Sequence, residues 1–442
     1  MTDYFGSHFE PTRVLELALD DPIPAIDATV GGATYRRALV LIRLHDEPLG
    51  LAELELPAQG LEPERVAQQV WRLVAKEARA HLVADGLPAP DVLPAEGLRV
   101  NSEAPCRIER ASVLDAAAPA SVIVATHERP QQLKRCLDSL MKQEYVPAEI
   151  IVVDSGPRSE GTRELVSGSY GEKVKYIRVD SPGLALAHNA ALSSATAPIV
   201  AFIDDDVVAD PLWLSFLVAG FSVEENVGCT TGLILPLELE TRAQWWVVAH
   251  SRLNKGFTRR VFDLDENRPA ETLYPYTAGL FGSGTNMAFS ARFLRENEGF
   301  DVSLGVGTPT RGGDDLAAFF DVLVRGYRLV YEPRALVWHD YRRDPSALPR
   351  HFFSYGMGLS AYLTRTAVRH PRRIAQLARL LPQGVAHMGR IRSDQTLGGV
   401  PRGFVRREWL GMVVGPAAYA ASRTRARGRR CAARSAAPAG NE

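Results

Sequence analysis

The stretch that decides the fold begins as SVIVATHERP (121–130) and ends as PIVAFIDDD (198–206). It alternates short, mostly apolar runs with segments of helical periodicity. Strands are expected at 122–124, 150–153, 174–179 and 199–203, and helices at 131–142, 162–167 and 184–194. Nearly continuous apolar strands separated by helices are typical of a parallel sheet that is buried on both faces. The pattern therefore predicts an α/β domain with a mostly parallel sheet and helices on both sides.

Acidic residues follow three of these expected strands. They are Glu128, Asp154 and the run Asp204-Asp205-Asp206. Open α/β sheets bind their ligands beyond the carboxyl ends of the strands. Carboxylates gathered there repel one another unless they face a cation or hydrogen-bond donors such as ribose hydroxyls. This edge of the sheet is therefore the predicted binding site.

The triple aspartate indicates a metal that is shared with a diphosphate. Asp204 and Asp206 lie two residues apart after a strand, where a turn can direct both carboxylates to one point. Magnesium takes one or two protein carboxylates and completes its shell with water and substrate phosphates. The glycine-rich dinucleotide fingerprint and the P-loop are both absent. The alternative is an ordinary acidic turn in which Asp210 caps a helix that begins at Pro211.

The length of 442 residues favours two or three domains. Two expected strands, 37–43 and 49–56, form a hairpin on which a helix from Pro63 packs, and 84–120 has the composition of a linker. Three parts are expected: an α+β module of unknown role, an α/β domain that contains the predicted binding site, and a helical, arginine-rich extension with a disordered tail. Their predicted ranges are 1–115, 116–345 and 346–442.

Charge is distributed unevenly, although the net charge is only −1. Residues 342–434 contain 19 arginines and three carboxylates. The apolar segment 409–421, flanked by arginines, suits the surface of an anionic membrane. Docking of that helix on the catalytic domain is the alternative. Nucleic acid is not an expected partner, because no nucleic-acid recognition motif accompanies the charge.

The cysteines and the N-terminus predict a cytoplasmic location. The basic C-terminal region adds the prediction of peripheral contact at the inner face of the membrane. The four cysteines are far apart, with no spacing typical of a zinc site or a disulfide framework. The first residues lack the basic start and apolar run of a signal peptide. The longest apolar segment, 409–421, is too short to span a bilayer.

Residues 121–339 resemble the catalytic domain of the family 2 glycosyltransferases. The motifs that carry the resemblance are 122–129, 152–156, Gly183 with 187–189, 203–206, 284–289 and 312–316. The resemblance implies a GT-A-like fold and an inverting transfer of a sugar, with Mg²⁺ or Mn²⁺ as the cofactor. The implied donor is a UDP, GDP or dTDP sugar, and the implied acceptor is a glycan, a lipid-linked sugar or a small molecule. Two positions depart from the usual pattern: His188 replaces an arginine, and Asp314 replaces a glutamate.

The same resemblance implies roles for individual residues. Asp315 matches the catalytic base, with Asp314 beside it, and the alternative is that this pair caps the following helix. Apart from the resemblance, the aromatic side chain of Trp245 is a candidate platform for the acceptor, with the hydrophobic core as its alternative. The other implied roles are nucleotide-sugar binding by Thr126, Glu128, Arg129, Asp154, Asn189, Asp204 and Asp205; metal binding by Asp204, Asp206 and His339; and acceptor binding by Gly284 and Asn286.

Two other functions fit the same pattern. A nucleotidyltransferase of related fold would need a glycine-rich loop with lysine or arginine after the first strand, whereas residues 126–130 are short and contain no glycine. A catalytically silent scaffold could bind a nucleotide sugar without turnover, but it would not need Asp204, Asp206 and Asp315 intact.

Overall fold

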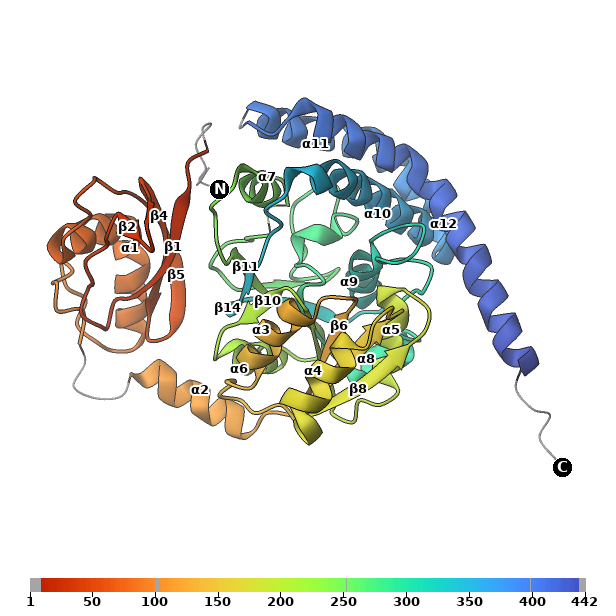
Figure 1. Ribbon diagram of the computed structural model, residues 1–442, viewed down its shortest axis with the longest axis horizontal. Coiled ribbons are helices and arrows are strands. Elements are labelled where there is room, and N and C mark those ends of the chain that lie inside the picture. The colour runs from red at the N-terminus through yellow and green to blue at the C-terminus, as the bar shows by residue number, and fades with distance from the viewer. Residues whose placement is uncertain (1–8, 100–103, 252, 398, 437–442) are drawn as a thin grey trace.

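The computed structural model describes residues 9–99, 104–251, 253–397 and 399–436. Its central sheet has the strand order β10-β14-β11-β13-β9-β6-β7-β8, and β12 pairs with β14. Four neighbouring strands are parallel: β6 (Ala120–Thr126), β7 (Glu149–Ser155), β8 (Val174–Val179) and β9 (Ile199–Asp204). Helices cover this part of the sheet on both faces (Figure 1): α3 (Pro130–Leu140), α4 (Gly161–Ser169), α5 (Leu184–Leu192) and α6 (Trp213–Ala219). The α/β fold class is confirmed.

The second half of the sheet mixes strand directions and places two later segments beside Asp204. Strand β13 runs antiparallel to β9 and aligns Asn286 with Ile203, while β10 aligns Val207 with His339 of β14. These pairings bring residues near 285 and 339 to the carboxyl end of β9. The elements are β10 (Val207–Ala209), β11 (Val227–Pro236), β12 (Arg260–Phe262), β13 (Asn286–Ser290), β14 (Arg328–His339), α7 (Arg242–Ser251), α8 (Ala291–Glu296) and α9 (Asp314–Val324).

The N-terminal module contains the expected hairpin and helix. Strands β4 (Arg37–Leu44) and β5 (Glu47–Glu55) are antiparallel, and α1 (Pro63–Ala84) packs on them. A third strand, β1 (Thr12–Ala18), was not predicted, and it pairs parallel with β4. The remaining strands are the short β2 (Thr29–Val30) and β3 (Ala33–Thr34).

The predicted linker 84–120 needs a correction, because it contains helix α2 (Pro105–Asp115). The sheet of the N-terminal module packs against the central sheet through a layer of leucines, including Leu39, Leu41 and Leu233. The buried Arg43 of β4 also forms an ion pair with Asp210, whose Oδ1 accepts a hydrogen bond from Leu212 N at 3.0 Å. The module is therefore fixed to the catalytic domain by both apolar and ionic contacts.

Three long helices form the C-terminal part: α10 (Leu348–Arg369), α11 (Ile374–Leu397) and α12 (Arg402–Ala436). Helices α10 and α12 approach closely at glycines, since a Cβ at Gly411 would lie 2.1 Å from the carbonyl oxygen of Phe353. The apolar segment 409–421 thus docks on the domain along one of its faces. Among the described residues, no helix is both long and apolar enough to cross a bilayer.

Arg365 of α10 anchors this helical part to the catalytic domain. Its Nη1 and Nη2 donate to Asp321 Oδ1 and Oδ2 of α9 at 2.7 and 2.6 Å, and both side chains are nearly inaccessible to solvent. Although burial opposes it, hydrogen bonding from His370 and Arg365 lowers the pKa of Asp321 to about 2. The carboxylate is therefore held ionised in the folded protein.

We expect Asp321→Asn to lower the free energy of unfolding at pH 7 by up to about 3–5 kcal/mol, because it leaves the buried Arg365 with only Asp301, 3.4 Å from its Nε, as a charge partner. A lowered carboxyl pKa stabilises the fold above the unfolded-state pKa of about 4, and this contribution is lost as pH falls through the folded-state pKa of about 2. Urea unfolding at pH 7 and in this acidic window measures both effects. The control Asp180→Asn removes an exposed partner of Arg178 and should change stability by less than about 1 kcal/mol. Equal losses for the two variants would contradict the anchoring role.

Candidate functional site

The predicted aspartate cluster lies where β9 ends. Asp204 is the last residue of β9, and its Oδ2 accepts a hydrogen bond from Thr285 Oγ1 at 2.8 Å. Asp205 is buried and accepts from Thr126 Oγ1 at 2.6 Å. Arg129 Nη1 bridges Asp205 Oδ1 and Asp206 Oδ2 at 3.2 and 3.0 Å. Thr126 and Arg129 therefore hold the cluster in place.

Three ligand atoms of this cluster converge on one point. One oxygen each from Asp204 and Asp206 and one ring nitrogen of His339 lie within 4.8 Å of one another. His339 Nε2 is 3.5 Å from Asp206 Oδ1. Burial lowers the pKa of His339, which favours the neutral imidazole that metals require. Burial, and then the charge of Asp206, raise the pKa of Asp204 to about 7.

This donor set fits a divalent cation. Two carboxylates that repel each other beside a neutral imidazole are stabilised by a shared positive charge. Carboxylate oxygens suit both magnesium and manganese, whereas an imidazole ligand suits manganese better than magnesium. The backbone supports the position of Asp206, whose carbonyl oxygen accepts a hydrogen bond from Asp340 N at 2.9 Å.

Asp314 and Asp315 begin helix α9, and a glycine turn precedes them. Gly313 has φ +88°, and a Cβ there would lie 2.5 Å from the carbonyl oxygen of Gly358 in α10. The pair therefore lies within the first turn of α9, which starts at Asp314 itself. Burial, and then the charge of Asp315, raise the pKa of Asp314 to about 7. Burial also raises the pKa of Asp315.

A single loop joins the two acidic groups. Gly284 N donates to Asp315 Oδ2 at 2.9 Å, and the next residue, Thr285, donates to Asp204. A Cβ at Gly284 would lie 3.1 Å from Asp315 Cβ, which is tighter than ordinary packing. Gly284 therefore allows Asp315 to approach this loop. Two adjacent loop residues, Gly284 and Thr285, thus link Asp315 to Asp204 through hydrogen bonds.

The residues predicted to bind the nucleotide lie on the parallel side of the cluster. Asp154 is fully buried, and its Oδ2 accepts a hydrogen bond from Tyr176 at 3.0 Å. Its Oδ1 is buried without a hydrogen-bond partner among the described residues, and burial raises its pKa. Glu128 has φ +56°, and its carboxylate accepts the backbone N–H groups of Arg158 and Ser159 at 2.7 and 3.0 Å. Asp154 thus keeps a buried oxygen without a hydrogen-bond partner among the described residues at the end of β7, while Glu128 orders the neighbouring loop.

Three other predicted residues are used inside the protein. The amide of Asn189 donates to and accepts from the backbone of Phe300, at 2.8 Å in both cases. Asn286 is fully buried and accepts from Trp213 Nε1 while donating to two backbone carbonyls. Trp245 is buried in α7. Asn189 and Asn286 thus use these amide groups inside the protein, and Trp245 belongs to the buried face of α7.

Helix α10 contributes residues that the motifs did not indicate. His351 and Tyr355 contact each other, with ring centroids 4.5 Å apart. Burial, and then the charge of Arg342, lower the pKa of His351 to about 4, while Asp206 acts in the opposite direction. Thr285 was also missed, since only the pairing of β13 with β9 places it beside Asp204. His188, in contrast, is a buried residue between Phe202 and Phe300.

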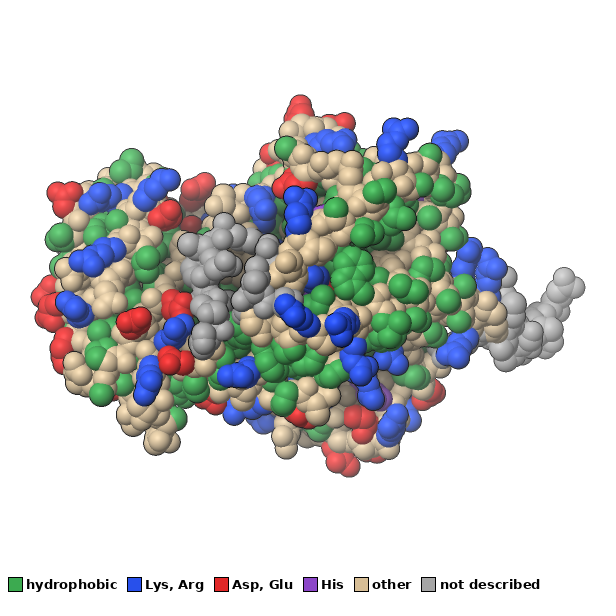
Figure 2. Space-filling model, turned by 90° about the horizontal axis from the view of Figure 1, so that it is seen from above, with side chains coloured by type: hydrophobic (Ala, Val, Ile, Leu, Met, Phe, Trp, Pro, Cys, Tyr) green, Lys and Arg blue, Asp and Glu red, His purple; other side chains and the backbone are tan. Residues whose placement is uncertain are grey.

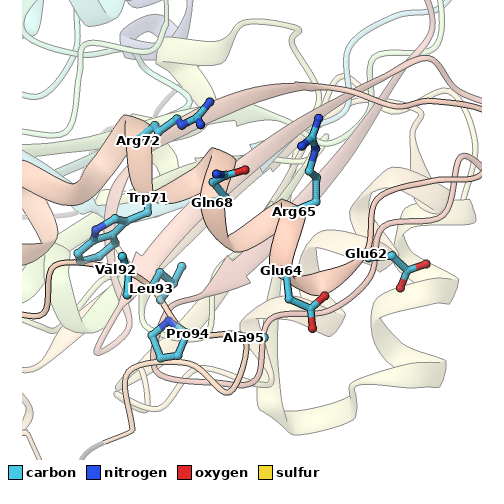
Figure 3. A pocket seen from close by; sticks show the side chains of 10 residues that line it. All are labelled: Glu62, Glu64, Arg65, Gln68, Trp71, Arg72, Val92, Leu93, Pro94 and Ala95. Atoms are coloured by element: carbon cyan, nitrogen blue, oxygen red, sulfur yellow. The ribbon is translucent and has the colours of Figure 1, made fainter.

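A separate hollow lies on the N-terminal module. It has a volume of about 700 Å³ and lies between α1 and the segment 92–95, where Trp71 faces Val92 and Leu93 (Figure 3). None of the acidic cluster residues lines it. It does not belong to the candidate site.

Comparison with known proteins gives a family match for the part of the chain that contains Asp204 and Asp206. Residues 121–296 match the family model described as glycosyl transferase family 2. A pre-mycofactocin glycosyltransferase of Mycobacterium tuberculosis is 26% identical over 304 residues, which cover 69% of this chain and 59% of that relative. A glucosyl-dolichyl phosphate glucuronosyltransferase of Haloferax volcanii is 23% identical over 243 residues, covering 51% and 71%.

A solved structure is similar as well. It is a mannosyltransferase of Pyrobaculum calidifontis in complex with GDP-Man and Mn²⁺, with 17% identity and a TM-score of 0.46, covering 68% of this chain and 88% of that one. The chain spans about six tenths of the length of the M. tuberculosis relative.

Proposed function

We propose that the protein transfers a sugar from a nucleotide diphosphate to an acceptor, with a divalent metal and inversion of the anomeric centre, because residues 121–296 match the family model of glycosyl transferase family 2. One observation supports this most strongly. The loop of Gly284 and Thr285 joins the carboxylate proposed as base to the carboxylate proposed as metal ligand. A base and a diphosphate-binding group so linked can act on the two sides of one anomeric carbon.

The cation would be held by Asp204, Asp206 and His339. When bound, it neutralises the charge that develops on the departing diphosphate. Arg129 lies beside Asp206 and adds a second positive charge to the same place. Asp154 is proposed to accept a hydrogen bond from the ribose or base, because its buried Oδ1 has no hydrogen-bond partner among the described residues.

Asp315 is the proposed general base. Both of its oxygens accept a backbone hydrogen bond, from Gly284 N and from Leu316 N at 2.8 Å, and each oxygen keeps another lone pair for an acceptor hydroxyl. The raised pKa of Asp315 makes it a better proton acceptor than an exposed aspartate. A single displacement opposite the leaving group inverts the anomeric centre, so an α-linked donor would give a β-linked product.

The donor is proposed to be a UDP, GDP or dTDP sugar, and the acceptor a glycan, a lipid-linked sugar or a small molecule. A panel of nucleotide sugars, assayed for nucleoside diphosphate release with and without Mn²⁺, tests this function. We expect metal-dependent release from one nucleotide class. Release of pyrophosphate from a nucleoside triphosphate and a sugar phosphate would favour the nucleotidyltransferase instead, and binding without turnover would favour the silent scaffold.

We further propose a peripheral position at an anionic membrane. On the outer side of α12, Leu410 and Val413 are exposed, at 53% and 77%. They lie one and two helical turns beyond the exposed Arg406. Hydrophobic side chains gather between basic side chains over this C-terminal part of the molecule (Figure 2), which contains arginines and no lysine. An apolar strip with arginines beside it suits the interface of anionic lipid.

Val413→Glu should lower the bound fraction on vesicles of phosphatidylglycerol by about tenfold, because it replaces an inserted apolar side chain with a repelled charge. Cosedimentation measures this effect. Val92→Glu is the matched control, since Val92 is similarly exposed, at 69%, on the N-terminal module. Equal binding by both variants, or equal binding to phosphatidylcholine, would contradict the membrane proposal.

A further inference from the structure

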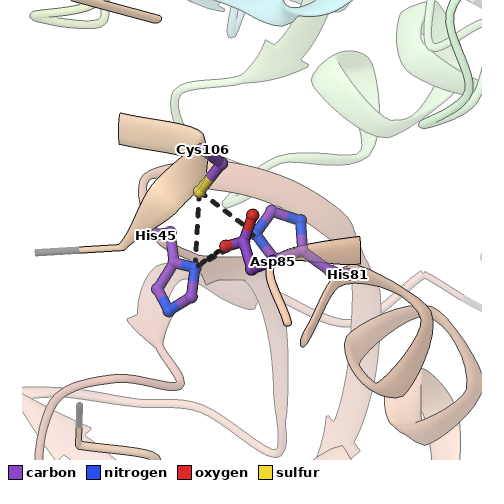
Figure 4. A group of neighbouring side chains, drawn as sticks. All are labelled: His45, His81, Asp85 and Cys106. Atoms are coloured by element: carbon purple, nitrogen blue, oxygen red, sulfur yellow. Dashed lines mark hydrogen bonds and ion pairs between the residues drawn. The ribbon is translucent and has the colours of Figure 1, made fainter. Parts of the chain in front are cut away.

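Four side chains of types that can bind metals, from three separate segments, converge in the N-terminal module (Figure 4). His45 belongs to the turn between β4 and β5, and His81 and Asp85 lie at the C-terminal end of α1. Cys106 is the second residue of α2. His45 is fully buried, and the other three side chains are partly buried.

Five of the six distances between the four ligand atoms are known, and they are close to those of a tetrahedron. His45 Nδ1 lies 3.1 Å from His81 Nε2, 2.9 Å from Asp85 Oδ2 and 3.5 Å from Cys106 Sγ. His81 Nε2 lies 3.5 Å from both Cys106 Sγ and Asp85 Oδ2. Zinc bonds of about 2.0–2.1 Å to nitrogen or oxygen and about 2.3 Å to sulfur place tetrahedral ligands about 3.3–3.6 Å apart. The observed separations are at or slightly below this range.

Hydrogen bonding alone does not account for the arrangement. His45 Nδ1 carries one proton or one lone pair, yet it faces His81, Asp85 and Cys106 at once. Two imidazole nitrogens, a carboxylate oxygen and a thiol sulfur that all point to one centre are the ligands of a cation. Thiolate with imidazole in a tetrahedral set selects zinc over magnesium, calcium or manganese.

We propose that His45, His81, Asp85 and Cys106 bind one Zn²⁺ in a structural site. Four protein ligands complete a tetrahedral shell and leave no position for substrate, which distinguishes structural from catalytic zinc. Binding releases the thiol proton of Cys106 to solvent and needs no redox partner.

The site connects the module to the catalytic domain. Glu47 Oε2 lies 3.8 Å from His81 Nδ1, in the position of an outer carboxylate that orients a zinc-bound histidine. Glu47 Oε1 accepts a hydrogen bond from Arg334 of β14 at 2.7 Å. The neighbouring Arg110 of α2 pairs with Asp46 and lies over Phe216 of α6, 5.2 Å from the ring centroid. Zinc would thus fix α2 between the two domains.

Cobalt titration of the full chain, after removal of metal by a chelator, tests the site. We expect visible bands of tetrahedral Co²⁺ and a near-ultraviolet thiolate-to-cobalt band that saturate at one ion per chain and disappear when Zn²⁺ is added. Cys106→Ser should abolish the thiolate band, and His81→Ala should weaken binding at least tenfold. Asp206→Ala should leave both bands unchanged, which separates this site from the proposed catalytic metal.

Cys229→Ser is the matched control, because the Cys229 thiol is buried in the catalytic core and should not affect the cobalt spectrum. Zn²⁺ should also raise the melting temperature of the wild-type chain and not that of Cys106→Ser. A wild-type chain without the thiolate band would overturn the proposal, whatever the stability of the variants. So would a band that persists in Cys106→Ser.

Discussion

Asp315→Asn is expected to lower kcat by about 10²–10⁴-fold while leaving the affinity for the nucleotide donor within about twofold. The amide keeps the size of the carboxylate but cannot accept the acceptor's proton. It also keeps only one oxygen for the two backbone N–H groups of Gly284 and Leu316. Steady-state kinetics and donor titration calorimetry measure the two quantities separately.

The control for this change is Asp265→Asn, which alters an exposed aspartate outside the site and should leave kcat unchanged. Transfer at the wild-type rate by Asp315→Asn would remove Asp315 as the base. In that case Asp314, whose pKa is raised to about 7, would be the next residue to replace.

Asp206→Ala is expected to abolish the metal dependence of donor binding and to lower kcat/KM by more than about a hundredfold. The variant loses one ligand of the cluster of Asp204, Asp206 and His339. Arg129 keeps Asp205 as a partner at 3.2 Å, so the local structure should persist. Donor affinity measured with and without Mn²⁺ gives the result directly.

Asp340→Asn is the matched control, because Asp340 is also acidic and near the site but pairs with Arg135. It should retain the metal dependence. Metal-dependent binding by Asp206→Ala at the wild-type affinity would contradict the assigned ligand set.

The parallel half of the fold followed from sequence because its signal is local. The apolar runs before Thr126, Asp154 and Asp204 each became a strand, and their carboxyl ends meet at one edge. Strand β1 and helix α2 were missed for opposite reasons. Strand β1 pairs with β4 across an 18-residue connection that sequence periodicity does not reveal, and α2 lies in a segment rich in proline and alanine.

Site residues were predictable where a motif fixes them to the end of a strand. Asp204, Asp206 and His339 converge as expected. Thr285 was missed because its place depends on an antiparallel pairing between distant strands. Asn189 and Asn286 match motifs, yet their amides satisfy backbone groups, which only three-dimensional packing decides.

The histidine and cysteine cluster was invisible to cysteine spacing for the same reason. Its ligands span residues 45 to 106, and only His81 and Asp85 share a helical turn. Two ligands at i and i+4 on a helix were the one local signal for it.

The proposed function depends on a cation that is held between a bound diphosphate and the aspartates Asp204 and Asp206. A thermal-shift panel of UDP, GDP and dTDP and their sugars, with and without Mn²⁺, measures this most directly. We predict that one nucleotide class raises the melting temperature only when the metal is present. No metal-linked shift with any of these nucleotides would contradict the proposed enzyme.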